Sequence, residues 1–168
     1  MTVIRREIAS DAAAIERVLC AAFPSHGEAR LVEALRVSGK LRVSLVALTE
    51  GEIVGYVAFS PATLDPPNDL VRLLGLAPVA VHPTFQRRTV GSLLVERGLE
   101  ECRGLSVDAV VVLGEPEFYS RFGFRRASAL GLGNEYGADE AFMVTELRTD
   151  CLANTSAIVR YAPEFALV

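Results

Sequence analysis

The sequence predicts a mixed α/β fold, with antiparallel strands in its first part and a parallel connection in its middle. Two apolar, β-branched runs at residues 41–49 and 52–60 are joined by Glu50-Gly51, which favours an antiparallel hairpin with a tight turn. Further on, an apolar strand at 76–81 is followed by a helical pattern and then by a nearly continuous apolar run at 107–113. A strand covered on both faces and reached through a helix predicts a right-handed parallel crossover.

The residues before the hairpin predict one strand and two helices. Residues 2–8 alternate well enough for a first strand. The next segment has the i, i+3, i+4, i+7 spacing of an amphipathic helix, with apolar residues at Ile15, Val18, Leu19 and Ala22. Pro24 ends that helix. A second helix is expected from about residue 28 to 37, burying Leu31, Ala34 and Leu35. Residues 61–69 are rich in turn-forming residues and predict a loop.

The middle helix has one apolar face and an internal glycine. The face comprises Gly91, Leu94, Val95, Gly98, Leu99 and Cys102. Glycine inside a helix costs about 1 kcal/mol relative to alanine, so Gly98 predicts close packing of the helix on a strand. Beyond the helix, residues 131–137 predict a flexible loop, 142–147 a further strand and 159–165 an edge strand. Arg160 in that strand is expected either in solvent or near a ligand pocket.

Composition and charge exclude several classes of function. Of the 168 residues, 51% are hydrophobic and 23% are charged, as in a globular domain. The net charge of −4, from 17 basic and 21 acidic residues, argues against a nucleic-acid binder, which needs a basic surface. The N-terminus has no signal-peptide core, and no apolar run reaches the length of a membrane span. We therefore expect neither a nucleic-acid nor a membrane partner.

The three cysteines, Cys20, Cys102 and Cys151, are odd in number and form no C-x-x-C motif. With only His26 and His82 beside them, they support neither a disulfide framework nor a zinc site, so no metal is expected. Cysteines of this kind suit a reducing compartment, and a cytoplasmic location is expected.

The loop before the middle helix is the first candidate site. Its residues Gln86-Arg87-Arg88-Thr89 are polar and basic, and Gly91 leads into the helix. Because the first turn of a helix leaves backbone N–H groups without partners and carries partial positive charge, this segment can bind an anion such as phosphate. A basic loop that opens a helix is also often no more than a solvated cap, and the loop alone leaves that alternative open.

A second informative segment, GEPEFYSRFGF, follows the apolar strand after the helix. Pro116 suits the first turn of a short helix, and Gly123 suits its end. Phe118 and Phe122, four residues apart, can anchor one face, which leaves Tyr119 on a neighbouring side. That side lies near the carboxyl end of the strand, where α/β sheets bind ligands. The alternative is that all three aromatic residues only fill the core.

Both segments resemble motifs of the GNAT superfamily of N-acetyltransferases. The run from Gln86 to Gly91, after a strand that ends V-x-P, is similar to the acetyl-CoA signature Q/R-x-x-G-x-G/A. FYSRFGF is similar to the family's F/Y-Y-x-R/K-x-GF ending, at the expected distance. The resemblance covers nearly the whole chain and is closest to the YhbS-like branch, through segments such as LGLAPVAV and EAFMVTEL. Thr89, whose hydroxyl can donate to phosphate, stands where the family has its first glycine, so a stiff residue replaces a permissive one.

The resemblance implies the acyl-CoA N-acyltransferase fold, with a central mixed sheet of about seven strands and flanking helices. It implies one domain at 1–168, on which a C-terminal extension at about 148–168 packs. It also implies transfer of the acetyl group of acetyl-CoA, in a ternary complex, directly to a primary amine of an unidentified small molecule or protein. No metal takes part in this reaction, and members of the family often form homodimers.

The resemblance further assigns roles to residues. The backbone along pantetheine is that of Val79, Ala80 and Val81, where an N–H can polarise the thioester carbonyl. The pyrophosphate is expected on Gln86, Arg87, Arg88, Thr89, Val90, Gly91 and Ser92, and the cofactor also contacts Phe118 and Tyr119. Tyr119 matches the general acid, because a phenol with a pKa of about 10 stays protonated at neutral pH and can donate to the departing thiolate. Candidates for the base, each also an ordinary surface residue, are Glu28, His26 and Glu135. His82 is expected to be structural.

Two other functions remain open from the sequence. A non-catalytic acyl-CoA sensor, suggested by Thr89, would bind CoA without turnover, and Tyr119 would then be structural. A protein-interaction domain would direct Arg87 and Arg88 at acidic partners and would not bind CoA saturably.

Overall fold

Nine strands and four α-helices follow one another along residues 1–168, which the computed structural model describes. The chain folds as two units: the first comprises residues 1–60, 77–101 and 163–168, and the second comprises residues 61–76 and 102–162. Two strands, β3 (Glu52–Asp65) and β4 (Leu73–Val81), contribute to both. None of the helices combines the length and the apolar character that crossing a bilayer requires. The single domain and its C-terminal extension stay predictions.

The first unit is built on an antiparallel sheet in the order β1-β2-β3. Its strands are β1 (Thr2–Arg6), β2 (Val43–Thr49) and the first part of β3. Thr49 pairs with Glu52 across Glu50-Gly51, two residues with φ values of 53° and 81°. Positive φ at both turn positions is typical of a type I′ hairpin, so the predicted hairpin is confirmed.

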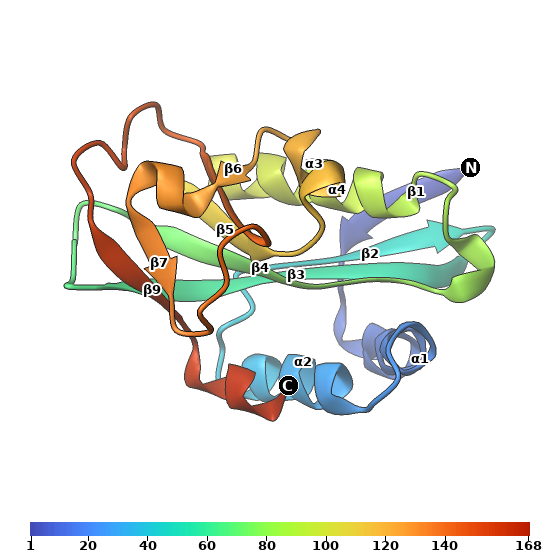
Figure 1. Ribbon diagram of the computed structural model, residues 1–168. Coiled ribbons are helices and arrows are strands. Elements are labelled where there is room, and N and C mark those ends of the chain that lie inside the picture. Colours follow the sequence, from blue (N-terminus) through green and yellow to red (C-terminus); the bar gives the residue numbers. More distant parts are fainter. The chain divides into compact units, whose positions relative to one another are not determined.

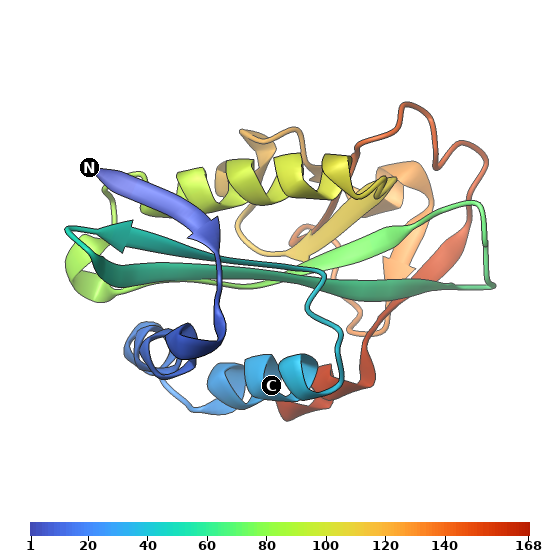
Figure 2. The same ribbon diagram turned by 180° about the vertical axis from the view of Figure 1, so that it is seen from behind.

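Helices cover both faces of this sheet (Figures 1 and 2). α1 (Ala12–Ala22) and α2 (Gly27–Val37) lie on one side, and α3 (Val90–Gly104) lies on the other. On the first side, helices and strands share one apolar cluster: Ile15, Val18, Leu19, Val32, Val46, Tyr56, Ala58 and Ala80. The predicted apolar stripe of α1 is confirmed for Ile15, Val18 and Leu19, which are buried, and Ala22 packs half-buried against the same cluster. In α2, Val32 is buried where Ala34 is expected, because α2 also packs against α1 and brings Val32 into the cluster.

α3 approaches the other face of the sheet closely. Leu94 and Val95 of this helix are fully buried. A Cβ atom at Gly98 would lie 2.3 Å from Cε1 of Phe59 on β3, far inside van der Waals contact. The close packing predicted for Gly98 is therefore confirmed, since only a residue without a side chain fits at this point.

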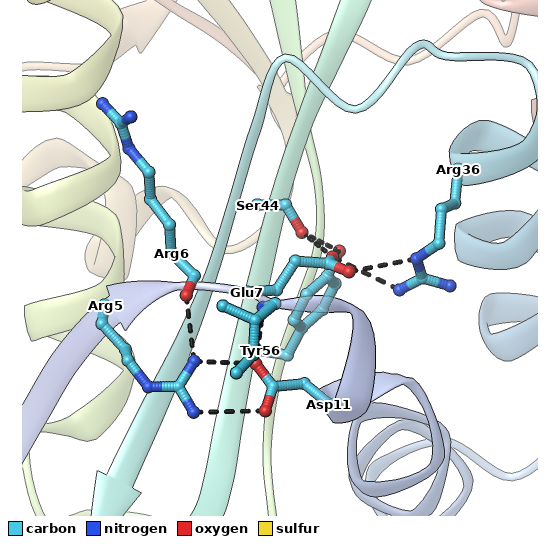
Figure 3. A network of polar contacts seen from close by, with 8 residues as sticks. Arg5, Arg6, Glu7, Asp11, Arg36, Ser44 and Tyr56 are labelled. Atoms are coloured by element: carbon cyan, nitrogen blue, oxygen red, sulfur yellow. Dashed lines mark hydrogen bonds and ion pairs between the residues drawn. The ribbon is translucent and has the colours of Figure 1, made fainter.

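A polar network ties α2 to the sheet (Figure 3). Glu7, just after β1, accepts hydrogen bonds from the hydroxyl of Ser44 and, at 3.3 Å, from that of Tyr56. Its Oε2 atom accepts from Nε of Arg36 at 3.0 Å. The hydroxyls of Ser44 and Tyr56 lie 2.6 Å apart, and Tyr56 is fully buried. Burial raises the pKa of Tyr56, and its hydroxyl has two polar partners, Ser44 and Glu7.

Ion pairs hold both ends of the first unit's chain. Arg5 donates two hydrogen bonds to Asp11 before α1, at 2.7 and 3.1 Å, and the N–H of Ile8 donates to the same carboxylate at 2.8 Å (Figure 3). The hydrogen bond from Arg5 lowers the pKa of Asp11. At the other terminus, the short helix η4 (Pro163–Leu167) packs against α2, and Nζ of Lys40 donates to Glu164 at 2.8 Å.

The second unit contains a mixed arrangement of strands. To parts of β3 and β4 it adds β5 (Ala109–Leu113), β6 (Arg125–Arg126), β7 (Leu132–Asn134), β8 (Phe142–Glu146) and β9 (Ala157–Tyr161). Residues 73–75 of β4 pair in parallel with residues 109–111 of β5, so the predicted parallel pairing is confirmed. β5 pairs antiparallel with β8, and β8 pairs antiparallel with β6.

Three predicted loop or strand assignments were wrong, and all three involve β9. Residues 61–65, predicted as the start of a loop, continue β3 and pair with β9 through residues 62–65. Residues 132–134, predicted in a flexible loop, form β7 and pair in parallel with β9. β9 therefore has partners on both sides and ends at Tyr161, so it is not an edge strand over 159–165. Strand partners distant in sequence decide these pairings, and local composition does not reveal them.

Candidate active site

In the first unit, β4 leads into the loop that the sequence identifies as an anion site. Val79 and Val81 at the end of β4 are half-buried and alternate with the buried Ala80. The N–H of His82 donates to the carbonyl of Val54 at 2.8 Å. The strand that precedes the loop is therefore anchored where it ends.

His82 and Gln86 shape the turn that follows β4. Nδ1 of His82 accepts from the N–H of Thr84 at 3.2 Å and so caps the short helix η2 (Pro83–Phe85). The side-chain amide of Gln86 donates to the carbonyl of Val81 at 3.1 Å. Both side chains are thus used within the protein, which agrees with the structural role expected for His82.

Between Gln86 and α3 the backbone presents a row of N–H groups. Arg87 and Thr89 have φ values of 63° and 66°, in the left-handed region. Alternation of left- and right-handed residues creates the concave nests of N–H groups that bind anions. The N–H groups of residues 87–91 donate to no acceptor of the protein, and at the start of α3 the N–H of Leu93 donates to the carbonyl of Thr89 at 3.0 Å. With the positive end of α3 behind it, the loop fits a phosphate.

The same loop carries two cations. Arg87 and Arg88 are exposed, and neither forms an ion pair. The guanidinium of Arg88 lies 5.5 Å above the ring of Phe85, a cation–π contact that keeps it beside the loop. In a chain whose net charge is −4, this local positive charge favours an anionic ligand.

Thr89 is the strained position of the loop. A β-branched residue in the left-handed region costs about 1–2 kcal/mol, which a glycine avoids. The hydroxyl of Thr89 donates to the carbonyl of Arg88 at 2.5 Å. It therefore stabilises the turn from within, whereas the sequence left it available as a donor to phosphate.

In the second unit, the short helix α4 (Pro116–Ser120) holds Tyr119 just after β5. Pro116 starts the helix and Gly123 follows it with a φ of 88°, so the predicted limits are confirmed. Tyr119 is only 6% exposed. Its ring makes edge contacts with Phe118 and Phe124, at centroid distances of 4.9 and 5.6 Å.

Burial keeps the hydroxyl of Tyr119 protonated. Loss of solvent raises the pKa of Tyr119 to about 12. No hydrogen bond joins this hydroxyl to another group of the protein, so its proton is not committed to a structural contact. Tyr119 can therefore donate a proton or a hydrogen bond to a ligand at neutral pH.

Gly114 makes room for this tyrosine and was not identified from the sequence. A Cβ atom at Gly114 would lie 2.3 Å from Cε2 of Tyr119. The available signal was a glycine at the junction of an apolar strand and a proline-started helix. Gly114 therefore contributes to the site by leaving room for the ring of Tyr119.

The packing of α4 differs from the prediction. Phe118 and Phe122 are half-buried, with ring centroids 5.1 Å apart, whereas Tyr119 is buried. The guanidinium of Arg121 lies 4.8 Å above the ring of Phe118 and covers it from the solvent side. The same guanidinium lies 5.5 Å from the centroid of Phe122, so a cation contacts both phenylalanines and Tyr119 is the buried residue that anchors the helix.

The three candidates for a base differ in their contacts. Oε1 of Glu28, in the first turn of α2, is buried and has no hydrogen-bond partner in the protein. Nδ1 of His26 lies 3.1 Å from Sγ of Cys20. Glu135, in the second unit, accepts from a backbone N–H at 3.2 Å and lies 3.5 Å from Arg160. Of the three candidates, Glu28 is the one with a buried carboxylate oxygen that has no hydrogen-bond partner in the protein. A bound ligand could supply that partner. No group of three or more His, Cys, Asp or Glu side chains is placed to hold a metal ion.

Known proteins match this chain along most of its length. The sequence profile of the Acetyltransferase (GNAT) domain matches residues 3–127. A protein of Escherichia coli strain K12, named uncharacterized N-acetyltransferase YhbS, is 39% identical over 164 residues, which cover 96% of this chain and 97% of that protein.

Two solved structures are similar as well. The YhbS acetyltransferase from Escherichia coli in complex with CoA has a TM-score of 0.92 and 36% identity, and the match covers 98% of this chain and 92% of that one. A GNAT family acetyltransferase from Brucella melitensis in complex with acetyl-CoA has a TM-score of 0.82 and 31% identity, with 98% of each chain covered. The fold and the YhbS-like branch expected from the sequence are confirmed by these matches.

Proposed function

The chain belongs to the GNAT family of acetyltransferases, and from this premise we propose that it moves the acetyl group of acetyl-CoA directly to a primary amine of a small molecule or a protein. The observation that carries the proposal is the loop after β4. Its N–H groups at residues 87–91 lack partners and its two arginines lack counter-ions, as a pyrophosphate ligand would require. Relatives solved with CoA and with acetyl-CoA support the same cosubstrate.

In this proposal the first unit holds the cosubstrate. The backbone of residues 79–81 lines pantetheine, and the loop from Gln86 to Ser92 receives the pyrophosphate. Arg87 and Arg88 add charge at its rim, where they have no competing partner. Acetyl-CoA brings an activated thioester, and an N–H of Val79 or Val81 polarises its carbonyl. These groups orient and activate the donor before the amine attacks.

Tyr119 acts on the leaving group. With a pKa of about 12 its hydroxyl is protonated at neutral pH, whereas a thiol has a pKa of about 8.5. Complete transfer of the proton to a thiolate of that pKa is uphill both before and after the bond breaks. The hydroxyl therefore acts by donating a hydrogen bond that strengthens as negative charge gathers on sulfur. Phe118 contacts the cosubstrate beside it.

Glu28 is the base in this mechanism. An alkylammonium has a pKa of about 10 and must lose a proton before it attacks, directly or through water. The buried Oε1 of Glu28 has no partner in the protein, so it can accept such a hydrogen bond. His26 and Glu135 already contact other groups of the protein.

One observation favours the alternative of an acyl-CoA sensor without turnover. Thr89 holds a φ of 66° at the position where the family signature has glycine, so the loop is strained where it should approach phosphate. A sensor would bind CoA saturably and would release no thiol with any amine. A protein-interaction domain would show no saturable binding of CoA.

Calorimetric titration with acetyl-CoA, CoA and dephospho-CoA tests the proposal. We expect saturable binding of acetyl-CoA and CoA, followed by amine-dependent thiol release in a screen of small amines and peptides. Binding without release would favour the sensor, and no binding up to about millimolar concentration, some thousandfold weaker than a micromolar site, would contradict both. The cytoplasmic location and the homodimer expected from the sequence stay predictions.

A further inference from the structure

Cys20 and His26 form a thiol–imidazole pair that the acetyl transfer does not use. Cys20 lies near the end of α1, and His26 precedes α2 across a short turn. Sγ of Cys20 and Nδ1 of His26 are 3.1 Å apart, within hydrogen-bond distance for sulfur. Cys20 is half-buried and His26 is exposed, so reagents in solution can reach the pair.

The thiol opens onto a pocket of the first unit. The pocket has a volume of about 870 Å³, and its walls include Arg17, Cys20, Leu48, Val54, His82 and Phe85. A volume of this size accommodates a small organic molecule. Cys20 therefore lies on the wall of a space in which a reaction partner can be held, while His26 contacts its sulfur from outside that wall.

The charges around the pocket leave one cation close to the thiol. Arg17 lies three residues before Cys20, one turn back along α1, and forms no ion pair. Arg5 is matched by Asp11 at 2.7 Å, and Glu52 is the remaining acid of the wall. Arg17 is thus a cation of the pocket wall without a counter-ion, on the same helix as the thiol.

We propose that Cys20 is a modification site for small-molecule disulfides, with His26 as the base that activates it. Nδ1 takes the proton from Sγ, and the sulfur electron pair attacks one sulfur of the incoming disulfide. The bond between the two incoming sulfurs breaks, and the departing thiolate takes the proton from His26. Cys20 ends as a mixed disulfide, and one equivalent of thiol is released.

The other two cysteines lack these features. Cys102 is fully buried on α3. Cys151, in the second unit, donates from Sγ to the carbonyl of Asp108 at 3.4 Å, and burial raises its pKa to about 11. Cys151 is thus an internal control, a half-buried cysteine whose sulfur contacts a backbone carbonyl and no imidazole.

The adduct has a consequence for the cosubstrate loop, which rests on the proposed function. A molecule bound to Cys20 occupies the pocket that Phe85 lines, and the ring of Phe85 supports Arg88. Displacing that ring moves a cation away from the loop. Modification of Cys20 therefore weakens the binding of acetyl-CoA.

Reaction of the full chain with oxidised glutathione, followed by peptide mass spectrometry, tests the site itself. We expect Cys20 to react at least about tenfold faster than Cys151, and His26→Gln to slow Cys20 about tenfold without changing Cys151. Equal rates at the two cysteines in the wild type would overturn the proposal even if the variant failed to fold, and so would an unchanged rate at Cys20 in a folded variant.

Titration of the glutathione-modified protein with acetyl-CoA tests the link to the loop. We expect the Kd to rise at least about threefold and to return to its original value after dithiothreitol, with unreacted Cys20→Ser as the control. An unchanged Kd would remove the link. If the unmodified protein binds no acetyl-CoA, the proposed function fails, while the selectivity for Cys20 is still measured by mass.

Discussion

Tyr56 in the first unit and Tyr119 in the second are both buried, and their hydroxyls have opposite surroundings. Burial raises the pKa of each. The hydroxyl of Tyr56 is hydrogen-bonded with Ser44 and Glu7, whereas that of Tyr119 lies among aromatic rings and bonds to nothing in the protein. A satisfied hydroxyl contributes its hydrogen bonds to folding, and an unsatisfied one kept protonated is available to a ligand.

The largest effect is expected from Tyr119→Phe. This change removes the proton donor and keeps the ring that packs against Phe118 and Phe124. Turnover should fall well over tenfold, because a positioned general acid contributes about 10²–10⁴ in rate. The Kd for acetyl-CoA and the Tm should stay near those of the wild type. Steady-state kinetics with calorimetry measures both, and an unaffected rate would remove Tyr119 from the acid role.

The same substitution at Tyr56 should have the reverse signature. Tyr56→Phe removes two hydrogen bonds from the network around Glu7 and leaves Ser44 with one partner fewer. We expect a loss of about 1–2 kcal/mol in the free energy of unfolding, measured with urea, and unchanged turnover at saturating substrate. A variant that lost turnover but kept its stability would contradict the comparison.

Thr89 adds a third hydroxyl, exposed but satisfied by the carbonyl of Arg88. Thr89→Gly removes a β-branched side chain at the point where the backbone has to approach phosphate, so acetyl-CoA should bind about threefold tighter. Thr89→Ala is the control, because it removes the hydroxyl and keeps the strain. Calorimetry decides between them: weaker binding by the glycine variant would make the hydroxyl a ligand.

The smallest expected effect is the absence of a decline in turnover on the alkaline side of the pH–rate profile. An acid must be protonated to act, and the pKa of Tyr119 is raised to about 12 by burial. Turnover should therefore show no decline between pH 8 and about 10.5, where an ordinary phenol with a pKa of about 10 would already lose activity. A decline with a midpoint near pH 10 in kcat, at constant protein stability, would place the acid in contact with solvent.

Sequence reasoning predicted the parts of the fold whose information is local. The hairpin at Glu50-Gly51 and the packing of Gly98 depend on a few neighbouring residues and a general steric rule. The end of β3 depends on β9, where Ala62 pairs with Tyr161, and no local pattern identifies that partner. Turn-forming residues around 61–69 and 131–137 therefore suggested loops where strands exist.

The candidate site was predictable in its position and not in its geometry. The motifs located the loop before α3 and Tyr119 in α4. They could not indicate that Arg87 shares the left-handed conformation of Thr89, because arginine carries no preference for it. They also could not indicate the contact between Cys20 and His26, since the direction of α2 after its turn decides which side chains meet.

The contact between Gly98 and Phe59 also limits how these two positions can change in evolution. No methyl group fits at position 98 while a phenylalanine ring occupies position 59. Any relative that replaces this glycine must carry a smaller residue on β3, so the two positions should covary. α3 begins directly after the loop at 86–89, and a side chain added at position 98 alone would push this helix away from the sheet. The pair is thus open to substitution only in two coordinated steps.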